Sequence, residues 1–312
     1  MTVMGGHVDQ DDPVAEALAR EAGLSQFFLG DPQGWKGPKV AYPGGAAALK
    51  AVAEEAGIDL YVHAPYVMNV ASSNNRIRIP SRKLLQQTLT AAAEIGAKGV
   101  IVHGGHVTQA EEPQLGFDNW RKCIDGLTID VPLLIENTAG GANAMARKLE
   151  RIDQLWSTIE GSANADRVGF CLDTCHAHAG GEELVGLVER VLGITGRIDL
   201  IHANDSRDAF DSGADRHANF GAGEVAGEAI VETVRQAGAP VVVEDVKTRV
   251  ECGELNYRNE NEYVHLVGRA GRNGLARHAE DDAARLVLAV VVGAGVLHDL
   301  HRLGAVRAHA GQ

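Results

Sequence analysis

The sequence predicts an α/β protein, a (β/α)₈ TIM barrel with an atypical C-terminal tail. Short apolar runs that end in polar residues alternate with helix-like stretches, and the unit recurs eight times before residue 246. Runs such as 132–135 and 240–243 are almost wholly apolar, as expected for strands buried on both faces of a parallel sheet. Eight alternations favour closure into a barrel over an open, doubly wound sheet, which is the structural alternative.

The predicted elements follow one another along the first 245 residues. Strands are expected at residues 3–8, 26–30, 60–64, 100–103, 133–137, 169–173, 200–204 and 241–244. Helices are expected at residues 44–56, 81–95, 117–127, 147–159, 182–192 and 224–237. The alternation stops after residue 245. We therefore divide the chain into a barrel at 1–245 and a divergent tail at 246–312.

Composition limits the classes of function. The chain has 312 residues and a net charge of −13, which argues against a nucleic-acid partner unless carboxylates gather around divalent cations. Four cysteines without a C-x-x-C pair favour reduced thiols and a cytoplasmic protein. The chain begins without a signal-peptide pattern, and its longest apolar run, 286–297, is too short to span a bilayer. No membrane partner is expected.

Residue types that bind metals end six of the predicted strands. These strand-end residues are His63, His103, Glu136, Asp173, His202 and Glu244. In a TIM barrel the carboxyl ends of the strands form one rim, where active sites lie. A single residue of this kind could be a hydrogen-bonded core histidine, a salt-bridged carboxylate or a polar cap, but six at equivalent positions favour ligands.

Two loop segments extend the set. Asp173 and His176 are three residues apart where a strand turns into a loop, which can aim them at different ions. In Asp215-Arg-His217 the carboxylate and the imidazole share one side of an extended chain. The alternative is a zinc site using Cys171 and Cys175. It is disfavoured because no second cysteine pair completes a thiolate site.

The set comprises five histidines, two aspartates and two glutamates, too many for one ion. Imidazole and carboxylate without thiolate fit Zn²⁺ or Mn²⁺ in a catalytic setting. Two or three ions would account for all of the ligands. Metals spaced about 3.5–4 Å apart are a standard device for hydrolysing phosphate esters.

These segments together resemble the endonuclease IV family, in the xylose isomerase-like TIM barrel superfamily. The resemblance spans roughly residues 1–245 and includes Glu136-Asn-Thr-Ala-Gly and His202-Ala-Asn-Asp-Ser. It implies three zinc ions per chain, with Mn²⁺ as an alternative at one site. The implied ligand sets are His63, His103 and Glu136; Glu136, Asp173, His202 and Glu244; and His176, Asp215 and His217.

The resemblance also implies an activity. The family hydrolyses the phosphodiester 5′ to abasic sites in double-stranded DNA, leaving a 3′-hydroxyl and a 5′-deoxyribose phosphate. Glu136 and Glu244 would be catalytic, the first by bridging two ions and the second by accepting a proton from water. Tyr66 matches a residue that enters the DNA, and Gln33 stands where some members place an arginine. The chain is expected to act as a monomer. His7 is expected to contact the metal ligands rather than to bind a metal ion itself.

Three features depart from the family pattern. Gln33 cannot supply the arginine's charge, Asp245-Val246 replaces the usual Thr-Pro, and the tail does not look like the family's final helix. Within the tail, residues 263–274 resemble a helicase arginine-finger motif, but no phosphate-binding loop accompanies them. Two alternatives stay open. One is a metal-dependent sugar isomerase or epimerase on the same barrel. The other is a catalytically impaired metal-binding homologue, if Glu244 does not reach the metals.

Overall fold

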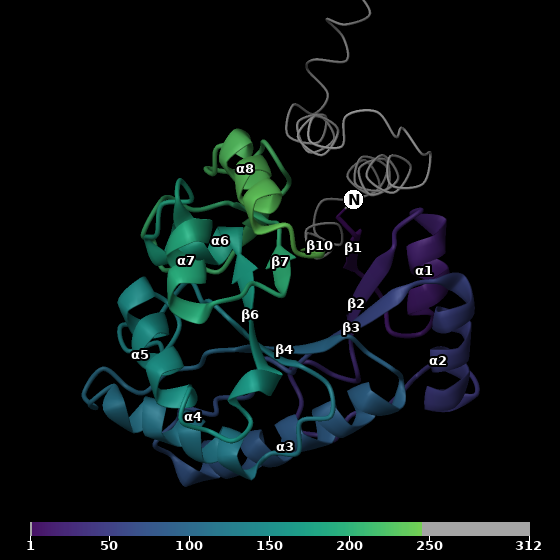
Figure 1. The fold of residues 1–312 in the computed structure, drawn as a ribbon, viewed down its shortest axis with the longest axis horizontal. Coiled ribbons are helices and arrows are strands. Elements are labelled where there is room, and N and C mark those ends of the chain that lie inside the picture. The colour runs from purple at the N-terminus through teal and green to yellow at the C-terminus, as the bar shows by residue number, and fades with distance from the viewer. Residues whose placement is uncertain (1, 245–312) are drawn as a thin grey trace, which may run out of the picture.

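The computed structural model describes residues 2–244, which form a closed barrel of eight parallel strands with helices outside (Figure 1). The strands lie in the order β1-β10-β7-β6-β5-β4-β3-β2, so the open-sheet alternative is wrong. The barrel strands are Met4–His7 (β1), Leu24–Phe28 (β2), Asp59–His63 (β3), Gly99–His103 (β4), Leu133–Glu136 (β5), Val168–Asp173 (β6), Leu200–His202 (β7) and Val241–Val243 (β10). The predicted TIM barrel is confirmed. The tail predictions, including Asp245-Val246 and the helicase-like segment, lie outside the described residues.

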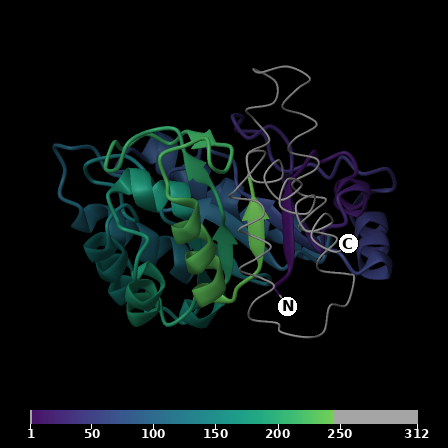
Figure 2. The ribbon, with the colours of Figure 1, turned by 90° about the horizontal axis from the view of Figure 1, so that it is seen from above.

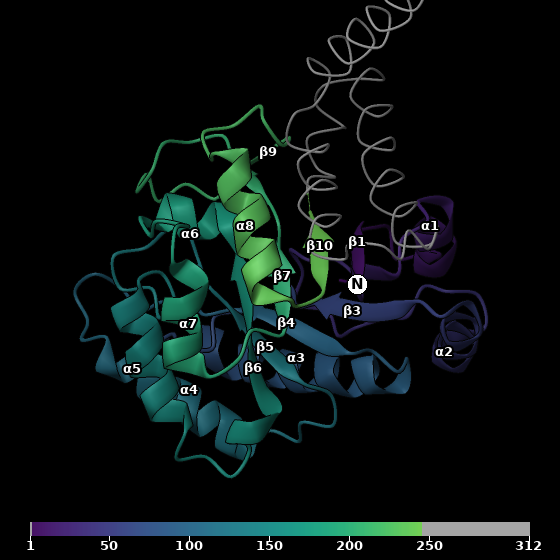
Figure 3. The ribbon, with the colours of Figure 1, turned by 45° about the horizontal axis from the view of Figure 1, so that its top comes forward.

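Helices cover the outside of the barrel (Figures 1 and 3). They are Pro13–Ala19 (α1), Gly45–Ala56 (α2), Asn75–Glu94 (α3), Gln114–Gly126 (α4), Leu149–Ile159 (α5), Thr174–Gly180 (α6), Leu187–Thr195 (α7) and Gly227–Ala237 (α8). Their apolar faces pack against the outer faces of the strands in one continuous core. Among the described residues, no helix is both long and apolar enough to cross a bilayer.

The first and last strands close the barrel. Met4 pairs with Val241 and Gly6 with Val243, and Figure 2 shows the purple β1 beside the yellow-green β10. At Gly5 a Cβ atom would overlap the carbonyl oxygen of Leu24, so only glycine allows β1 to approach β2 this closely. The closure brings the two ends of the described chain together.

Three predicted elements differ most from the structure, and one of them is α7, which spans Leu187–Thr195 rather than residues 182–192 and follows Gly186 at a positive φ of 69°. Strand β2 spans Leu24–Phe28 rather than residues 26–30, because Leu24 already pairs with Gly5 of β1 and the chain leaves the sheet at Leu29, whose carbonyl accepts from Lys39 N. Helix α3 begins at Asn75 rather than residue 81, because Asn74 caps it and Pro80 is tolerated inside it.

Two helices escaped prediction. Asp12 accepts a hydrogen bond from Ala15 N and Pro13 follows at the first position of α1, a common helix start. The segment after Asp173 is helix α6 rather than a loop, because the Asp173 carboxylate accepts from His176 N at 2.7 Å. Asp173 therefore fixes the position of His176 through the backbone.

A small hairpin lies beside α6, outside the barrel sheet. Asp205–Ser206 (β8) pairs antiparallel with His217–Ala218 (β9), with Ser206 opposite His217. Figure 3 shows β9 at the same end of the barrel as α6. The hairpin carries the predicted Asp215 and His217 toward the strand ends.

Candidate metal centre

The barrel interior is built in two layers. The lower layer is apolar apart from one thiol and one phenol, and it consists of Leu24, Tyr61, Ile101, Leu134, Cys171, Leu200 and Val242. Side chains two residues apart on a strand share a face, so the residue two places further on points into the same interior. Those residues form the upper layer: Gln26, His63, His103, Glu136, Asp173, His202 and Glu244. Strand alternation alone thus brings six predicted ligands to one level.

The first candidate group contains His63, His103 and Glu136, whose ligand atoms lie within 4.8 Å of one another. Oε2 of Glu136 is 3.3 Å from Nε2 of His63 and 3.4 Å from Nε2 of His103. Nδ1 of His63 lies 2.8 Å from the carbonyl oxygen of Ala64, which holds the ring with Nε2 turned to the site. The group matches the first predicted ligand set.

The second group contains Glu136, Asp173, His202 and Glu244. Nδ1 of His202 is 3.0 Å from Glu136 Oε1, 3.3 Å from Glu244 Oε2 and 3.9 Å from Asp173 Oδ2. Glu136 therefore offers Oε2 to the first group and Oε1 to the second, the arrangement of a bridging carboxylate. Glu244 reaches the group, which removes the stated reason for expecting an impaired homologue.

The third group contains His176, Asp215 and His217. Oδ1 of Asp215 lies 3.0 Å from Nε2 of His176 and 3.6 Å from Nε2 of His217. His217 Nε2 is also 3.9 Å from Asp173 Oδ2, which joins this group to the second. Asp173 and His176 belong to different candidate groups.

The loop around the third group is held by buried carboxylate contacts. Asp205, fully buried, accepts backbone hydrogen bonds from Ser206, Gly221, Gly223 and Val225 at 2.8–3.0 Å. At Gly223 a Cβ would overlap Ser206 O and crowd Asp205, so glycine is required there. The glycines after His217 therefore wrap the chain around one carboxylate.

A second clamp holds the same loop from the other side. Asp211 Oδ1 accepts from Arg147 Nη2 at 2.9 Å and from Lys148 Nζ at 3.0 Å. The Asp211 and Gly213 amides donate to the carbonyl oxygens of α6 residues His178 and Ala179. These contacts tie the Asp215-bearing loop to α6 and to the segment after β5.

Several buried nitrogen and oxygen atoms of the site lack suitable protein partners in the described part of the chain, and metal ions would supply them. Ring nitrogens Nε2 of His176 and His217 are buried and make no well-formed hydrogen bond within residues 2–244, although Nε2 of His176 faces Oδ1 of Asp215 at 3.0 Å. Glu136 and Asp173 are fully buried, and no Lys or Arg in residues 2–244 pairs with either of them. Buried carboxylates without a fixed cation are costly, and divalent ions would remove that cost. The donor set therefore fits a divalent metal cluster.

The groups perturb one another's protonation. Burial alone would raise the pKa of Glu136, but His202 and His103 hold that pKa well below its usual range. Burial would lower the pKa of His202, yet Cys171, Glu244 and Glu136 raise it well above the usual value. Burial raises the pKa of Asp173. Strongly shifted groups gathered in one cleft are typical of a functional site.

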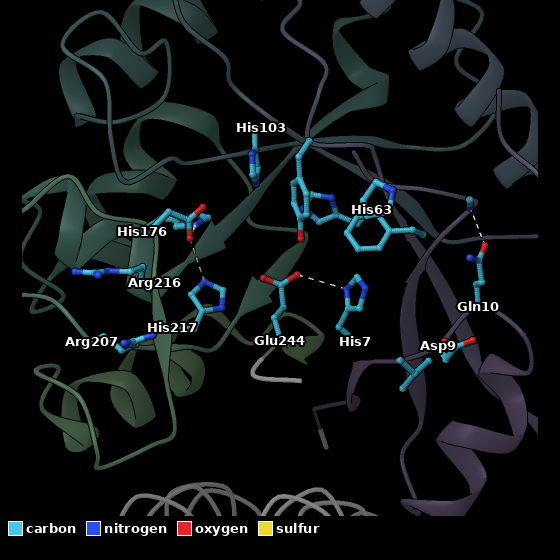
Figure 4. A pocket seen from close by; sticks show the side chains of 16 residues that line it. His7, Asp9, Gln10, His63, His103, His176, Arg207, Arg216, His217 and Glu244 are labelled. Atoms are coloured by element: carbon cyan, nitrogen blue, oxygen red, sulfur yellow. Dashed lines mark hydrogen bonds and ion pairs between the residues drawn. The ribbon is translucent and has the colours of Figure 1, made fainter. Parts of the chain in front are cut away.

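A cavity of about 750 Å³ opens over the site. Its wall includes His63, His103, His176, His217 and Glu244. Figure 4 shows these side chains facing one opening. Candidate ligands from every group are thus reachable from solvent.

The two predicted DNA contacts differ in position. Tyr66 lines the cavity, with its ring stacked on His103 at 5.7 Å and edge-on to Phe28 at 5.1 Å. Gln33 does not line the cavity. It is exposed on the neighbouring loop, which is linked to the rim where Tyr66 N donates to Pro32 O.

Sequence reasoning missed other polar residues at the site. Arg207 and Arg216 line the cavity beside His217 (Figure 4), and nothing in their local sequence marks that position. Gln26 was placed at the start of its strand, although the structure puts it in the upper layer. Nδ1 of His7 lies 3.7 Å from Glu244, and His7 also lines the cavity.

The cysteine alternative is not favoured by the geometry. Cys171 belongs to the apolar lower layer and to none of the candidate ligand groups in residues 2–244. Cys175 lies on α6, not in a loop, and its thiol forms a further candidate ligand group with Asp173 and His217. Burial raises the pKa of the Cys171 thiol to about 12, so a protonated thiol is the resting form. The two cysteines do not form one site.

Known proteins place the chain in a family. A family model described as "Xylose isomerase-like TIM barrel" matches residues 17–265. A probable endonuclease 4 of Mycobacterium marinum is 54% identical over 242 residues, which are 78% of this chain and 92% of that protein. The probable endonuclease 4 of Mycobacterium tuberculosis is 53% identical over the same shares of the two chains.

Solved structures agree on the fold. Endonuclease IV from Thermus thermophilus superimposes with a TM-score of 0.71 at 24% identity, covering 86% of this chain and 99% of that one. A D-tagatose 3-epimerase-like protein reaches 0.60 at 16% identity, covering 84% and 98%. At these identities the likeness concerns the barrel alone. The mycobacterial relatives, over half identical across most of their length, decide the matter: the chain belongs to the endonuclease IV family of xylose isomerase-like TIM barrels.

Proposed function

We propose that this chain is a DNA-repair endonuclease that hydrolyses the phosphodiester 5′ to abasic sites in double-stranded DNA. The products are a 3′-hydroxyl and a 5′-deoxyribose phosphate. One observation carries the proposal: the three metal-capable groups made of imidazoles and carboxylates alone, linked through Glu136 and Asp173, open into one cavity. The relatives named probable endonuclease 4 support the reaction class, and the family resemblance supports the abasic specificity.

Three zinc ions are proposed, with Mn²⁺ as an alternative at one site, because the ligands are imidazoles and carboxylates without thiolate. They would be held by His63, His103 and Glu136; by Glu136, Asp173, His202 and Glu244; and by His176, Asp215 and His217. Bound divalent ions supply charge neutralisation at the attacked phosphate and acidify water at neutral pH.

Glu244 is proposed as the proton acceptor. Burial would raise its pKa, but His202 and the neighbouring His7 hold the pKa well below its usual range. The carboxylate is therefore ionised at neutral pH. Its side chain is 10% exposed and lines the cavity, so it can reach a water molecule there.

Tyr66 is proposed to enter the DNA at the lesion. Its ring is anchored on His103 and Phe28, yet the residue remains 38% exposed at the cavity. Burial and the charges of Glu244 and Glu136 raise the pKa of its hydroxyl, so the ring stays neutral. Extruding a nucleotide that has lost its base is cheap, because no base pair must be broken.

Arg207 and Arg216 are proposed to contact DNA phosphates. Both line the cavity, and Arg216 is oriented by Asp208. They place positive charge at the opening of a chain whose net charge is −13. Gln33 offers an exposed neutral amide on the neighbouring loop. The protein is proposed to act as a monomer in the cytoplasm.

A nicking assay tests the proposal. Zinc-loaded protein should cut a duplex with one central abasic site on its 5′ side and leave the matched intact duplex uncut. A chelator and Glu136→Gln should each abolish cutting. If the abasic duplex stays uncut and the protein turns over a ketose, the proposal is wrong. The result would favour a sugar epimerase, whose barrel this chain shares.

A further inference from the structure

Gln26 occupies a ligand position in the upper layer but was not among the predicted ligands. It follows Leu24 on β2 by two residues, as His63 follows Tyr61 on β3 and His202 follows Leu200 on β7. Its side chain is fully buried. A neutral amide thus takes the place on β2 that imidazoles and carboxylates take on other strands.

The Gln26 amide bonds to three side chains of the site. Its Oε1 is 2.8 Å from Nε2 of His202, and its Nε2 donates to Glu244 Oε1 at 2.5 Å. The same Nε2 is 3.1 Å from Nδ1 of His7. The amide has one acceptor oxygen and two N–H donors, and both ends are engaged.

The orientation of the amide is fixed by charge. A flipped amide would set its oxygen against the Glu244 carboxylate, and two acceptors cannot share that contact. With Nε2 toward Glu244, Oε1 must face His202, so His202 carries a proton on Nε2. Nδ1 of His202 is then the nitrogen left to bind a metal, and it faces Glu136 and Glu244.

We propose that Gln26 is a positioning residue for the second metal site, selecting the His202 tautomer that binds through Nδ1 and orienting Glu244 beside it. The inference rests on the proposed metal cluster. Histidine ligands normally have their other nitrogen fixed by a partner, and losing that partner typically weakens metal binding about 10- to 100-fold. For His63 the partner is a backbone carbonyl; for His202 it is this amide.

The experiment compares the full-length zinc protein with Gln26→Met, which keeps side-chain length but removes the amide. Ser25→Ala is the matched control, since Ser25 is an equally buried neighbour on β2 whose hydroxyl has no hydrogen-bond partner in residues 2–244. Zinc retained per chain is measured against increasing concentrations of a competing chelator. Histidine ¹⁵N spectra of the zinc-loaded proteins report which His202 nitrogen carries the proton.

We expect Gln26→Met to release one zinc per chain at about 10- to 100-fold lower chelator concentration, with an altered His202 signal. Ser25→Ala should match the wild type in both readouts. If Gln26→Met fails to fold, as circular dichroism would reveal, Gln26→Leu takes its place. Unchanged zinc retention and an unchanged His202 signal would overturn the role of Gln26 alone. A wild type that binds no zinc would overturn the metal cluster and this inference together.

Discussion

Oε1 of Glu136 lies 3.0 Å from Nδ1 of His202, and both side chains are fully buried. The other carboxylate oxygen faces His63, so one glutamate touches two ligand groups at once. An amide at this position would replace one of those oxygens with a donor, and no single orientation could serve both groups.

Glu136→Gln is therefore expected to lower the nicking rate more than about 100-fold, since it disturbs two ion sites directly. Steady-state nicking of an abasic duplex, with zinc content measured in parallel, checks this. Glu160→Gln, at the exposed end of α5, serves as the control. Full activity of Glu136→Gln would contradict a bridging role.

Zinc binding is expected to strengthen as pH rises toward 8. Burial would lower the pKa values of His176 and His202, but their carboxylate neighbours raise both well above 6.5 in the metal-free protein. Zinc must displace those protons. Calorimetry in buffers of different ionisation enthalpy should record proton release on binding at pH 7, and binding without proton release would refute the assignment.

The same shifts set the stability of the metal-free protein. The raised histidine pKa values contribute stability that is complete below 6.5 and lost as pH rises through the folded values. The lowered pKa values of Glu136 and Glu244 contribute stability that is present above 4.5 and lost as pH falls. Urea unfolding after metal removal should therefore show greatest stability from these groups between pH 4.5 and 6.5.

Asp211→Asn should weaken retention of one zinc by a few-fold without unfolding the protein. The change removes the charge that holds Arg147 and Lys148, while asparagine tolerates the positive φ of 58° at this position. Asp125→Asn, which breaks an exposed pair with Arg121 on α4, is the matched control. Equal zinc retention in both variants would show that the clamp does not position the Asp215 loop.

Arg207→Ala should weaken DNA binding similarly for all duplex sequences and reduce the slope of log K against log salt by about 1. Arg207 lines the cavity, whereas Arg151 on α5 is away from it and gives the control Arg151→Ala. Fluorescence anisotropy at salt concentrations from about 50 to 200 mM measures the slopes. Identical slopes for the two variants would exclude a phosphate contact at Arg207.

Asp205→Asn should destabilise the protein by about 1–3 kcal/mol, because its amide would face backbone N–H groups that now donate to a carboxylate oxygen. Oδ2 accepts from Gly221 and Gly223, and Oδ1 accepts from Ser206 and Val225. Denaturant unfolding measures the loss. A variant as stable as the wild type would mean that the loop has another anchor.

Sequence periodicity was sufficient for the barrel and for placing metal-capable residues at the strand ends. His63, for example, closes an apolar run and needed no tertiary information to be placed at the rim. Gln26 could not be found this way, because a start of β2 set two residues too late put it at the bottom of the strand. An error of two residues in the predicted start of a strand assigns a side chain to the wrong interior layer.

Other misses depended on contacts distant in sequence. Arg207 and Arg216 come to the cavity because β8 and β9 pair, and strands of two residues leave no periodic signal. Helix α6 is short and rich in histidine, so propensity did not mark it, although its cap at Asp173 was visible. The capping aspartate was interpreted only as a ligand.

Strand β10, which closes the barrel where Val241 pairs with Met4, is made last, and this has a consequence for biosynthesis. The second ligand group needs Glu136 from the middle of the polypeptide and Glu244 from beyond its last barrel strand. A ribosome-bound chain that has not yet emerged past β10 therefore lacks an assembled centre, however well its earlier segments have folded. Full metal capture, and with it any hazard of cutting nucleic acid, is postponed until translation has passed that strand.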